Sequence, residues 1–219
     1  MNLEKFRKSP PELYVLTGTK FTPGIDHFQI ITKVLEAGCK IIQMREKEMC
    51  DRDLFYFAKR LKELTELYGA YLIINDRIDI ALAVNSDGVH LGQNDIPVLE
   101  ARKILGPNKI IGLSTHSIFQ ALRAVENGVD YIGVGPIFET HTKSDVCSPV
   151  GTELIKKVIE YKEKINIPFY AIGGIKLENV KEVLAAGARN IAVVTGIITA
   201  KDVYETTKKF IETIKNYSV

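Results

Sequence analysis

Cysteine is scarce in this chain, and its spacing excludes two classes of stabilised small domain. The three cysteines, Cys39, Cys50 and Cys147, are odd in number and form no CxxC pair. That pattern argues against a disulfide framework and against a structural zinc site. It suits a reducing compartment, so we expect a cytoplasmic protein.

Long apolar runs and a strong net charge are lacking as well. No apolar run is long enough to span a bilayer, and the charged N-terminal stretch 1–11 has no apolar signal-peptide core. A net charge of +2 gives no reason to expect nucleic acid or an anionic membrane as a partner. We therefore expect small-molecule partners, no nucleic acid and no membrane, and leave a homo-oligomer open.

The 219 residues suffice for one large domain, and no linker or compositional break divides them. We expect a single domain over 1–219, with 1–11 as an extension before the first strand. Eight short apolar runs, typical of strands buried on both faces, alternate with helical patterns. The expected strands are 13–16, 41–45, 71–74, 88–91, 110–114, 131–135, 168–172 and 190–194.

The clearest helical pattern covers 51–68, with Asp51 as the expected N-cap and Gly69 as the left-handed stop. Glycines repeat at the same point of other units, at Gly38, Gly128 and Gly187. Eight such βα units close most naturally as an α/β fold of the (β/α)8 TIM-barrel type. A doubly wound open sheet is the alternative, but no GxGxxG motif follows the first strand. The long irregular stretch 136–151 is expected to be a functional loop.

Polar side chains after the second strand suit an anion. Alternation puts Gln43, Arg45 and Lys47 on one face, where arginine offers forked hydrogen bonds and lysine a point charge. A salt-bridged strand end, with Glu46 as the partner, is the alternative.

Two carboxylates, Asp76 and Asp95, follow the third and fourth strands. On neighbouring parallel strands, both carboxylates could reach one ion. Mg²⁺ is usually bound in this way, by one or two carboxylates with water and phosphate at its remaining positions. Each could instead be the N-cap of the helix that follows.

Further polar groups are expected at the same edge of the barrel. Ser114 could donate to a phosphate, although Ser117 is the better helix cap. For His90 and His116 we expect orienting or structural roles, because we see no nucleophile arranged with either. Glycines after the last two strands, Gly174 among them, would let backbone N–H groups approach an anion closely.

The chain resembles the thiamine-phosphate synthase family over essentially its whole length. The matching stretches are Gln43-Met44-Arg45-Glu46-Lys47, Ile74-Asn75-Asp76-Arg77-Ile78-Asp79-Ile80-Ala81, Gly88-Val89-His90-Leu91-Gly92-Gln93-Asn94-Asp95, Gly133-Val134-Gly135-Pro136-Ile137-Phe138, Thr140-His141-Thr142-Lys143 and Ala171-Ile172-Gly173-Gly174-Ile175. The family joins a hydroxymethylpyrimidine diphosphate to a thiazole phosphate and releases pyrophosphate by a dissociative, Mg²⁺-assisted mechanism. This transferase needs no enzyme nucleophile.

The resemblance implies roles for the residues of the expected site. The pyrimidine diphosphate would be held by Gln43, Met44, Arg45, Glu46, Lys47, Asn75, Ser114 and Lys143, of which Arg45, Lys47, Ser114 and Lys143 would be catalytic. Mg²⁺ would be held by Asp76 and Asp95. The thiazole phosphate would be held by Thr140, His141, Thr142, Gly174, Val194 and Thr195. The family usually has serine where this chain has Thr195, which keeps the hydroxyl.

Two alternatives to the synthase were considered. A thiazole tautomerase on the same barrel would leave the diphosphate residues Arg45, Lys47 and Lys143 idle. A non-catalytic phosphate-ligand sensor would need an effector or DNA-binding domain, and nothing in the chain resembles one.

Overall fold

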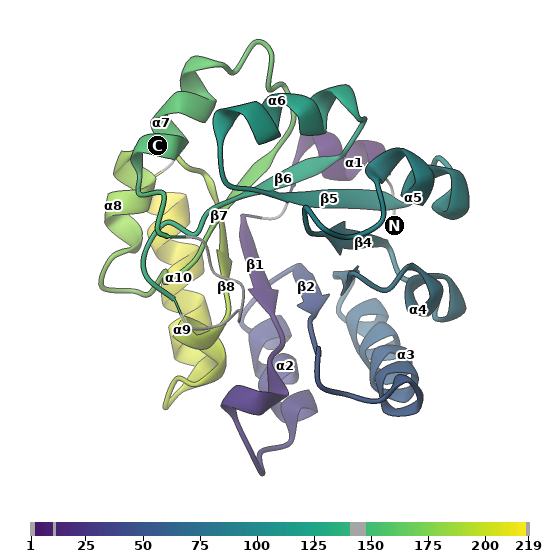
Figure 1. Cartoon of the computed structure of the whole chain (residues 1–219). Coiled ribbons are helices and arrows are strands. Elements are labelled where there is room, and N and C mark those ends of the chain that lie inside the picture. The colour runs from purple at the N-terminus through teal and green to yellow at the C-terminus, as the bar shows by residue number, and fades with distance from the viewer. Residues whose placement is uncertain (1–2, 11, 141–147, 218–219) are drawn as a thin grey trace.

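Eight parallel strands close into a barrel in the computed structural model, which describes residues 3–10, 12–140 and 148–217. The strands follow chain order around the barrel, and β1 pairs with both β2 and β8 (Figure 1). Their bounds are β1 Leu13–Leu16, β2 Ile41–Met44, β3 Tyr71–Asn75, β4 Gly88–Leu91, β5 Ile110–Thr115, β6 Tyr131–Val134, β7 Phe169–Ile172 and β8 Asn190–Val193. The TIM-barrel prediction is confirmed, and each strand begins and ends within one residue of its expected position.

Helices cover the outside of the barrel (Figure 1). Their bounds are α1 Leu3–Lys8, α2 His27–Glu36, α3 Asp51–Leu67, α4 Ile78–Ala83, α5 Val98–Leu105, α6 Ile118–Glu126, α7 Glu153–Glu160, α8 Val180–Ala185, α9 Thr195–Ile198 and α10 Val203–Tyr217, with a short 3₁₀ turn, η1, at Thr19–Phe21. Cys50 and not Asp51 is the N-cap of α3, so that prediction was wrong by one residue. The left-handed stop at Gly69 is confirmed, with φ of 58°.

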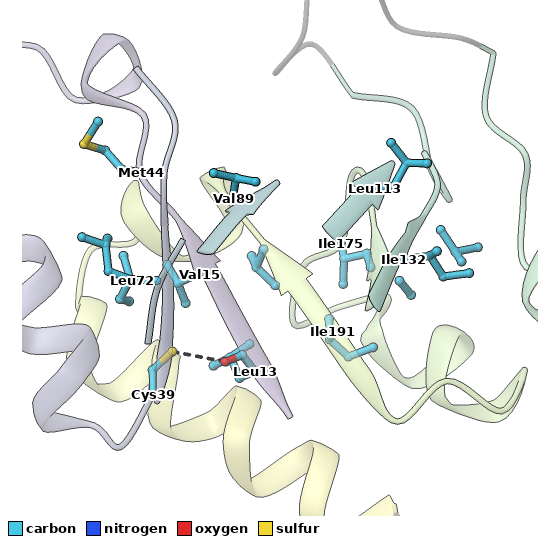
Figure 2. Packing of buried hydrophobic residues seen from close by; sticks show 14 of the residues in the cluster. Leu13, Val15, Cys39, Met44, Leu72, Val89, Leu113, Ile132, Ile175 and Ile191 are labelled. Atoms are coloured by element: carbon cyan, nitrogen blue, oxygen red, sulfur yellow. Dashed lines mark hydrogen bonds between the residues drawn. The ribbon is translucent and has the colours of Figure 1, made fainter. Parts of the chain in front are cut away.

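Side chains from alternate strand positions form two separate apolar layers, as the two-residue period of a strand requires. The outer layer, between the barrel and its helices, includes Val15, Leu72, Ile132 and Ile191 (Figure 2). In the same layer the Cys39 thiol donates to the Leu13 carbonyl at 3.2 Å. Burial raises the pKa of this thiol to about 11, so it stays protonated and inert.

The inner layer fills the barrel with aromatic rings. Tyr14, Tyr131 and Tyr170 are fully buried there and meet edge to face, with ring centroids 5.1 to 6.0 Å apart. Such contacts are the preferred geometry for aromatic pairs. The barrel interior is therefore a packed core and not a pore.

Helix α1 closes the N-terminal end of the barrel, where the sequence predicted only an extension. Phe6 is fully buried, and its ring lies 5.4 Å from that of Tyr71 and 5.7 Å from that of Tyr131. Beside it Arg7 pairs with the buried carboxylate of Asp130. This end of the barrel is consequently a structural floor.

No helix in the described part of the chain combines the length and apolar character needed to cross a membrane. Cys39 and Cys50 both carry free thiols. The third cysteine, Cys147, lies outside the described residues.

Candidate active site

The carboxyl ends of β2, β3 and β4 bring three of the predicted charged residues together. Lys47 Nζ lies 3.1 Å from Asp76 Oδ2, and the Asp76 carboxyl is within hydrogen-bonding reach of that of Asp95. Lys47 is half exposed, whereas Asp76 is mostly covered. The three groups thus form one cluster, here called the charged cluster: Lys47, Asp76 and Asp95.

Asp76 occupies a backbone conformation that few non-glycine residues adopt, with φ of 60°. Its N–H donates to the carbonyl of His90 on β4 at 2.9 Å, which holds the turn after β3 against the next strand. Burial, and then the neighbouring carboxyl of Asp95, raise the pKa of Asp76, while Lys47 opposes the rise. Two acidic groups are therefore held close together at an electrostatic cost.

Neither aspartate caps a helix, so the capping alternatives were wrong. Helix α4 has Arg77 as its N-cap and α5 has Pro97, and no side chain caps either helix. Asp95 Oδ2 instead accepts from the N–H of Gly92 at 2.6 Å and closes the turn after β4.

The donor set of the charged cluster fits a hard divalent cation. Carboxylate oxygens are the protein ligands that Mg²⁺ prefers, and this ion commonly keeps one or two of them with water and substrate phosphate. Among the described residues no group of three His, Cys, Asp or Glu side chains could enclose an ion. An ion here would thus keep most of its positions for water or phosphate oxygens.

The loop after β1 supports the end of β2. The Thr17 hydroxyl accepts from the N–H of Arg45 at 2.9 Å, and Thr17 N–H donates to the carbonyl of Gln43 at 2.8 Å. Glu46 accepts from both the N–H and the hydroxyl of Thr19, at 3.0 and 2.6 Å. The alternative of a salt-bridged strand end named Glu46 as the partner, whereas the structure pairs Lys47 with Asp76.

A cavity of about 240 Å³ opens beside the charged cluster. It is lined by Met44, Glu46, Lys47, Met49, Leu54, Asn75, Asp76 and Arg77. Met44 also belongs to the outer apolar layer (Figure 2). Arg77 had no predicted role, and its guanidinium pairs with Asp51 at 2.6 Å and with Asp79 at 2.5 Å. The side chain that follows Asp76 is therefore tied to the starts of α3 and α4.

Below the charged cluster, Ser114 and His90 are in contact. His90 Nε2 lies 2.9 Å from Ser114 Oγ, and His90 Nδ1 lies 2.9 Å from the Tyr131 hydroxyl. The sequence did not reveal this contact, in which both side chains point inward from the neighbouring strands β4 and β5. His116 Nδ1 contacts the carbonyl of Gly135, and its expected orienting or structural role stays a prediction.

Hydrogen bonds continue from this pair across the barrel. The Tyr131 hydroxyl lies 3.0 Å from that of Tyr14, which accepts from Gln43 Nε2 at 2.8 Å. We call Gln43, Tyr14, Tyr131, His90 and Ser114 the interior chain. The two-residue period of β1 and β6 points both tyrosines into the barrel, and this period is the sequence signal that could have identified them as neighbours of the site.

The glycine turns after β7 and β8 are tightly packed. Gly174 has φ of 65°, and a Cβ there would lie 2.5 Å from the carbonyl oxygen of Glu139. A Cβ on Gly196 would lie 2.7 Å from the carbonyl oxygen of Ile175. These glycines therefore allow backbone segments to approach each other.

The predicted thiazole-phosphate residues fall partly within the described chain. Thr140, Gly174, Val194 and Thr195 are each partly buried, Val194 and Thr195 being the N-cap and first residue of α9. His141, Thr142 and Lys143 lie outside the described residues.

Comparison with known proteins gives one consistent family. The family described as Thiamine monophosphate synthase matches residues 13–197. Thiamine-phosphate synthase of Shouchella clausii is 51% identical over 194 residues, which are 89% of this chain and 91% of that protein. The protein of the same name from Halalkalibacterium halodurans is 49% identical over 198 residues, covering 90% and 92% of the two chains.

A solved structure agrees with these relatives. Thiamine phosphate pyrophosphorylase from Pyrococcus furiosus superposes with a TM-score of 0.84 at 37% identity, covering 94% of this chain and 96% of that one. A 3-hexulose-6-phosphate synthase, at 17% identity and a TM-score of 0.64, shares the fold alone. The chain belongs to the thiamine monophosphate synthase family.

Proposed function

We propose that this chain is a thiamine-phosphate synthase, a transferase that joins a hydroxymethylpyrimidine diphosphate to a thiazole phosphate and releases pyrophosphate. The observation that carries the proposal is the charged cluster, Lys47 with Asp76 and Asp95, at adjoining strand ends in a member of this family. Two carboxylates beside a lysine suit a diphosphate with its cation. A thiazole tautomerase has no diphosphate to hold.

The proposed reaction exchanges one bond for another. The C–O bond between the pyrimidine methylene and the diphosphate breaks, and its electron pair leaves with pyrophosphate. The thiazole nitrogen then donates its lone pair to the methylene cation, which gives thiamine phosphate. No proton has to be removed by the protein, so the task of the site is to stabilise negative charge on the leaving group.

Cationic and hydroxyl side chains supply that stabilisation. Arg45 and Lys47 lie at the end of β2, and Ser114 lies on β5. We assign all three, together with Lys143, to the oxygens of the departing pyrophosphate. Gln43, Met44, Glu46 and Asn75 complete the proposed pyrimidine-diphosphate site.

Asp76 and Asp95 would hold Mg²⁺ in this proposal. When bound, the ion would neutralise charge on the pyrophosphate oxygens. The two carboxylates themselves take up no proton from substrate and act only as ligands.

The thiazole phosphate is assigned to the other side of the barrel mouth. Its proposed contacts are Thr140, His141, Thr142, Gly174, Val194 and Thr195. The glycine at 174, with its positive φ, and the start of α9 at Thr195 support this assignment, because glycine lets backbone approach a ligand closely and the first N–H groups of a helix have no partner within it. The proposal includes a cytoplasmic location, in keeping with the free thiols of Cys39 and Cys50.

The test is to incubate the purified protein with both substrates, with Mg²⁺ or with a chelator, and to follow thiamine phosphate. We expect product only with Mg²⁺. Lys47→Gln should lower kcat/KM by about 100-fold or more, since one donor to developing charge is lost.

Lys103→Gln is the matched control, because Lys103 is an exposed lysine paired with Glu100 on α5. It should retain full activity. Isomerisation of the thiazole phosphate without any coupled product would overturn the proposal in favour of the tautomerase.

A further inference from the structure

The interior chain has two ends with different hydrogen-bonding capacity. At one end the Gln43 amide nitrogen donates to the Tyr14 hydroxyl, and at the other His90 Nε2 meets Ser114 Oγ. Three groups between these ends, the two phenols and the imidazole, can each both donate and accept. The direction of donation along the chain is therefore set at the Gln43 end, where the amide nitrogen can only donate.

Starting from Gln43, each link fixes the next. The Tyr14 hydroxyl accepts from Gln43, and the acceptor nearest to its own single hydrogen is then the Tyr131 hydroxyl, 3.0 Å away. Tyr131 then donates to His90 Nδ1, so the neutral imidazole carries its hydrogen on Nε2 and donates it to Ser114 Oγ. Burial raises the pKa of both Tyr14 and Tyr131, which keeps the two phenols protonated as this order requires.

Glycines on the neighbouring strands make room for this arrangement. Gly112 on β5 is paired in register with His90 on β4 and with Tyr131 on β6. A Cβ on Gly112 would lie 2.1 Å from Tyr131 Cζ, and one on Gly133 would lie 3.4 Å from His90 Cε1. A larger residue at position 112 would therefore occupy the space that the Tyr131 phenol needs to reach the imidazole.

The space around the interior chain holds little else. The cavity that its members line measures about 20 Å³, enough for about one water molecule. The links are consequently direct contacts between side chains.

We infer that the interior chain is a directional relay that fixes His90 as the Nε2–H tautomer and so presents Ser114 as a hydrogen-bond donor. In this state the imidazole cannot take a proton from Ser114, and the Ser114–His90 pair is not a nucleophile with its base. The serine hydrogen is instead available to an anionic acceptor. Tyr14 and Tyr131 are positioning residues, because they act on Ser114 through His90.

This inference rests on the proposed function only for the identity of the acceptor, which would be the leaving pyrophosphate. If the hydrogen bonds of the interior chain ran in the opposite direction, Ser114 would have the opposite role. With His90 protonated on Nδ1, the imidazole would accept from Ser114 and activate it.

The two directions are distinguished by ¹⁵N NMR of the full chain labelled at histidine, recorded without substrates at mildly alkaline pH. The chain has four histidines, and the signals of His90 are identified as those that are lost in His90→Gln. We expect His90 of the wild type to show the Nε2–H tautomer. Protonation on Nδ1 would overturn the inference.

Tyr131→Phe should convert this single tautomer into a mixture while leaving the ring packing in place. Tyr14→Phe should do the same, because Tyr14 is linked to His90 through the Tyr131 hydroxyl. Phe6→Leu is the control, because the Phe6 ring packs on Tyr131 and offers no hydrogen bond. A tautomer unchanged in both Tyr131→Phe and Tyr14→Phe would contradict the relay.

The functional readout is thiamine phosphate formation. Tyr131→Phe should lower kcat by about tenfold with little change in KM for the thiazole phosphate, as expected for a weakened hydrogen bond to the leaving group. A wild type without synthase activity would defeat the proposed function but would leave the NMR result to decide the relay.

Discussion

Asp76 combines an unusual backbone conformation with an unfavourable electrostatic position. Its φ of 60° lies in the left-handed region, which asparagine and aspartate enter more readily than other side chains. Its carboxyl also faces that of Asp95. Strain of this kind gathers at functional sites, where the surrounding structure enforces it. The substitution chosen at this position therefore decides what an experiment reports.

Asp76→Ala and Asp76→Asn should separate these two properties. Alanine in the left-handed region should lower the free energy of unfolding by about 1 kcal/mol, whereas asparagine tolerates it. Both variants should lose coupling activity, because both lose a carboxylate. Urea unfolding together with the activity assay checks this, and equal stability of the two variants would contradict the role of the backbone.

The paired carboxylates predict a dependence of stability on pH. Because the folded-state pKa of Asp76 is raised, the folded chain binds more protons than the unfolded chain in the window between the two pKa values. Stability from this group is thus lost as pH rises through that window. Asp95→Asn, measured with a chelator present, should weaken this dependence and be at least as stable as the wild type at neutral pH. A steeper dependence would contradict the assignment.

At the scale of elements, glycines serve the barrel in two different ways. Gly112 is a position where space is needed, since a Cβ would lie 2.1 Å from Tyr131. Gly24 has φ of 77° and nothing within 4 Å of the added atom, so it is a position of conformation alone. Gly112→Ala should destabilise by about 3 kcal/mol through overpacking, and Gly24→Ala by about 1 kcal/mol. Thermal unfolding of both variants measures the difference, and a smaller effect at Gly112 would show that the inner layer can rearrange.

Helix α1 should contribute strongly to stability despite its short length. Phe6→Ala removes a fully buried ring and should lower the free energy of unfolding by about 3–5 kcal/mol. Phe119→Ala on α6 is the control, because Phe119 is 64% exposed and should change stability little. If urea unfolding shows that Phe6→Ala and Phe119→Ala lower the free energy of unfolding equally, α1 does not stabilise this end of the barrel.

The elements that the sequence predicted well are those with a repeated signal. Strands buried on both faces read as apolar runs, and the glycine stops mark helix ends, so all eight strands were placed within one residue. Helix α1 was not predicted, because six residues are too few to show a helical period. Its stability comes instead from the packing of Phe6 against the end of the barrel. The Ser114–His90 contact was not predicted, because two inward-facing positions on different strands share no local sequence pattern.

At the scale of the whole molecule, the two ends of the barrel have separate roles. The N-terminal end carries Phe6 and the Arg7–Asp130 pair, and the opposite end carries the charged cluster. Division of this type is general for the fold. Lys47→Gln should therefore lower activity with a change in Tm below that of Phe6→Ala. Under conditions where it is folded, Phe6→Ala should keep most of its kcat/KM.

The part of the site that could be predicted is the part that follows from the order of the strands along the chain. Strand order put Asp76 and Asp95 together, and the structure brings them within reach of each other. The left-handed turn at Asp76 and the direction of the interior chain depend on side-chain packing, which no short motif encodes. The roles assigned to the site residues stay predictions until they are tested.

The sealed floor has a consequence for the order of events in turnover. Phe6 and the tyrosine rings fill the barrel interior, so ligands of the charged cluster would approach from the carboxyl ends of the strands. In the proposed function, both substrates would arrive and both products would leave on this one side. Pyrophosphate that stays bound would then occupy the place of the next pyrimidine diphosphate, so we predict that pyrophosphate competes with the incoming diphosphate.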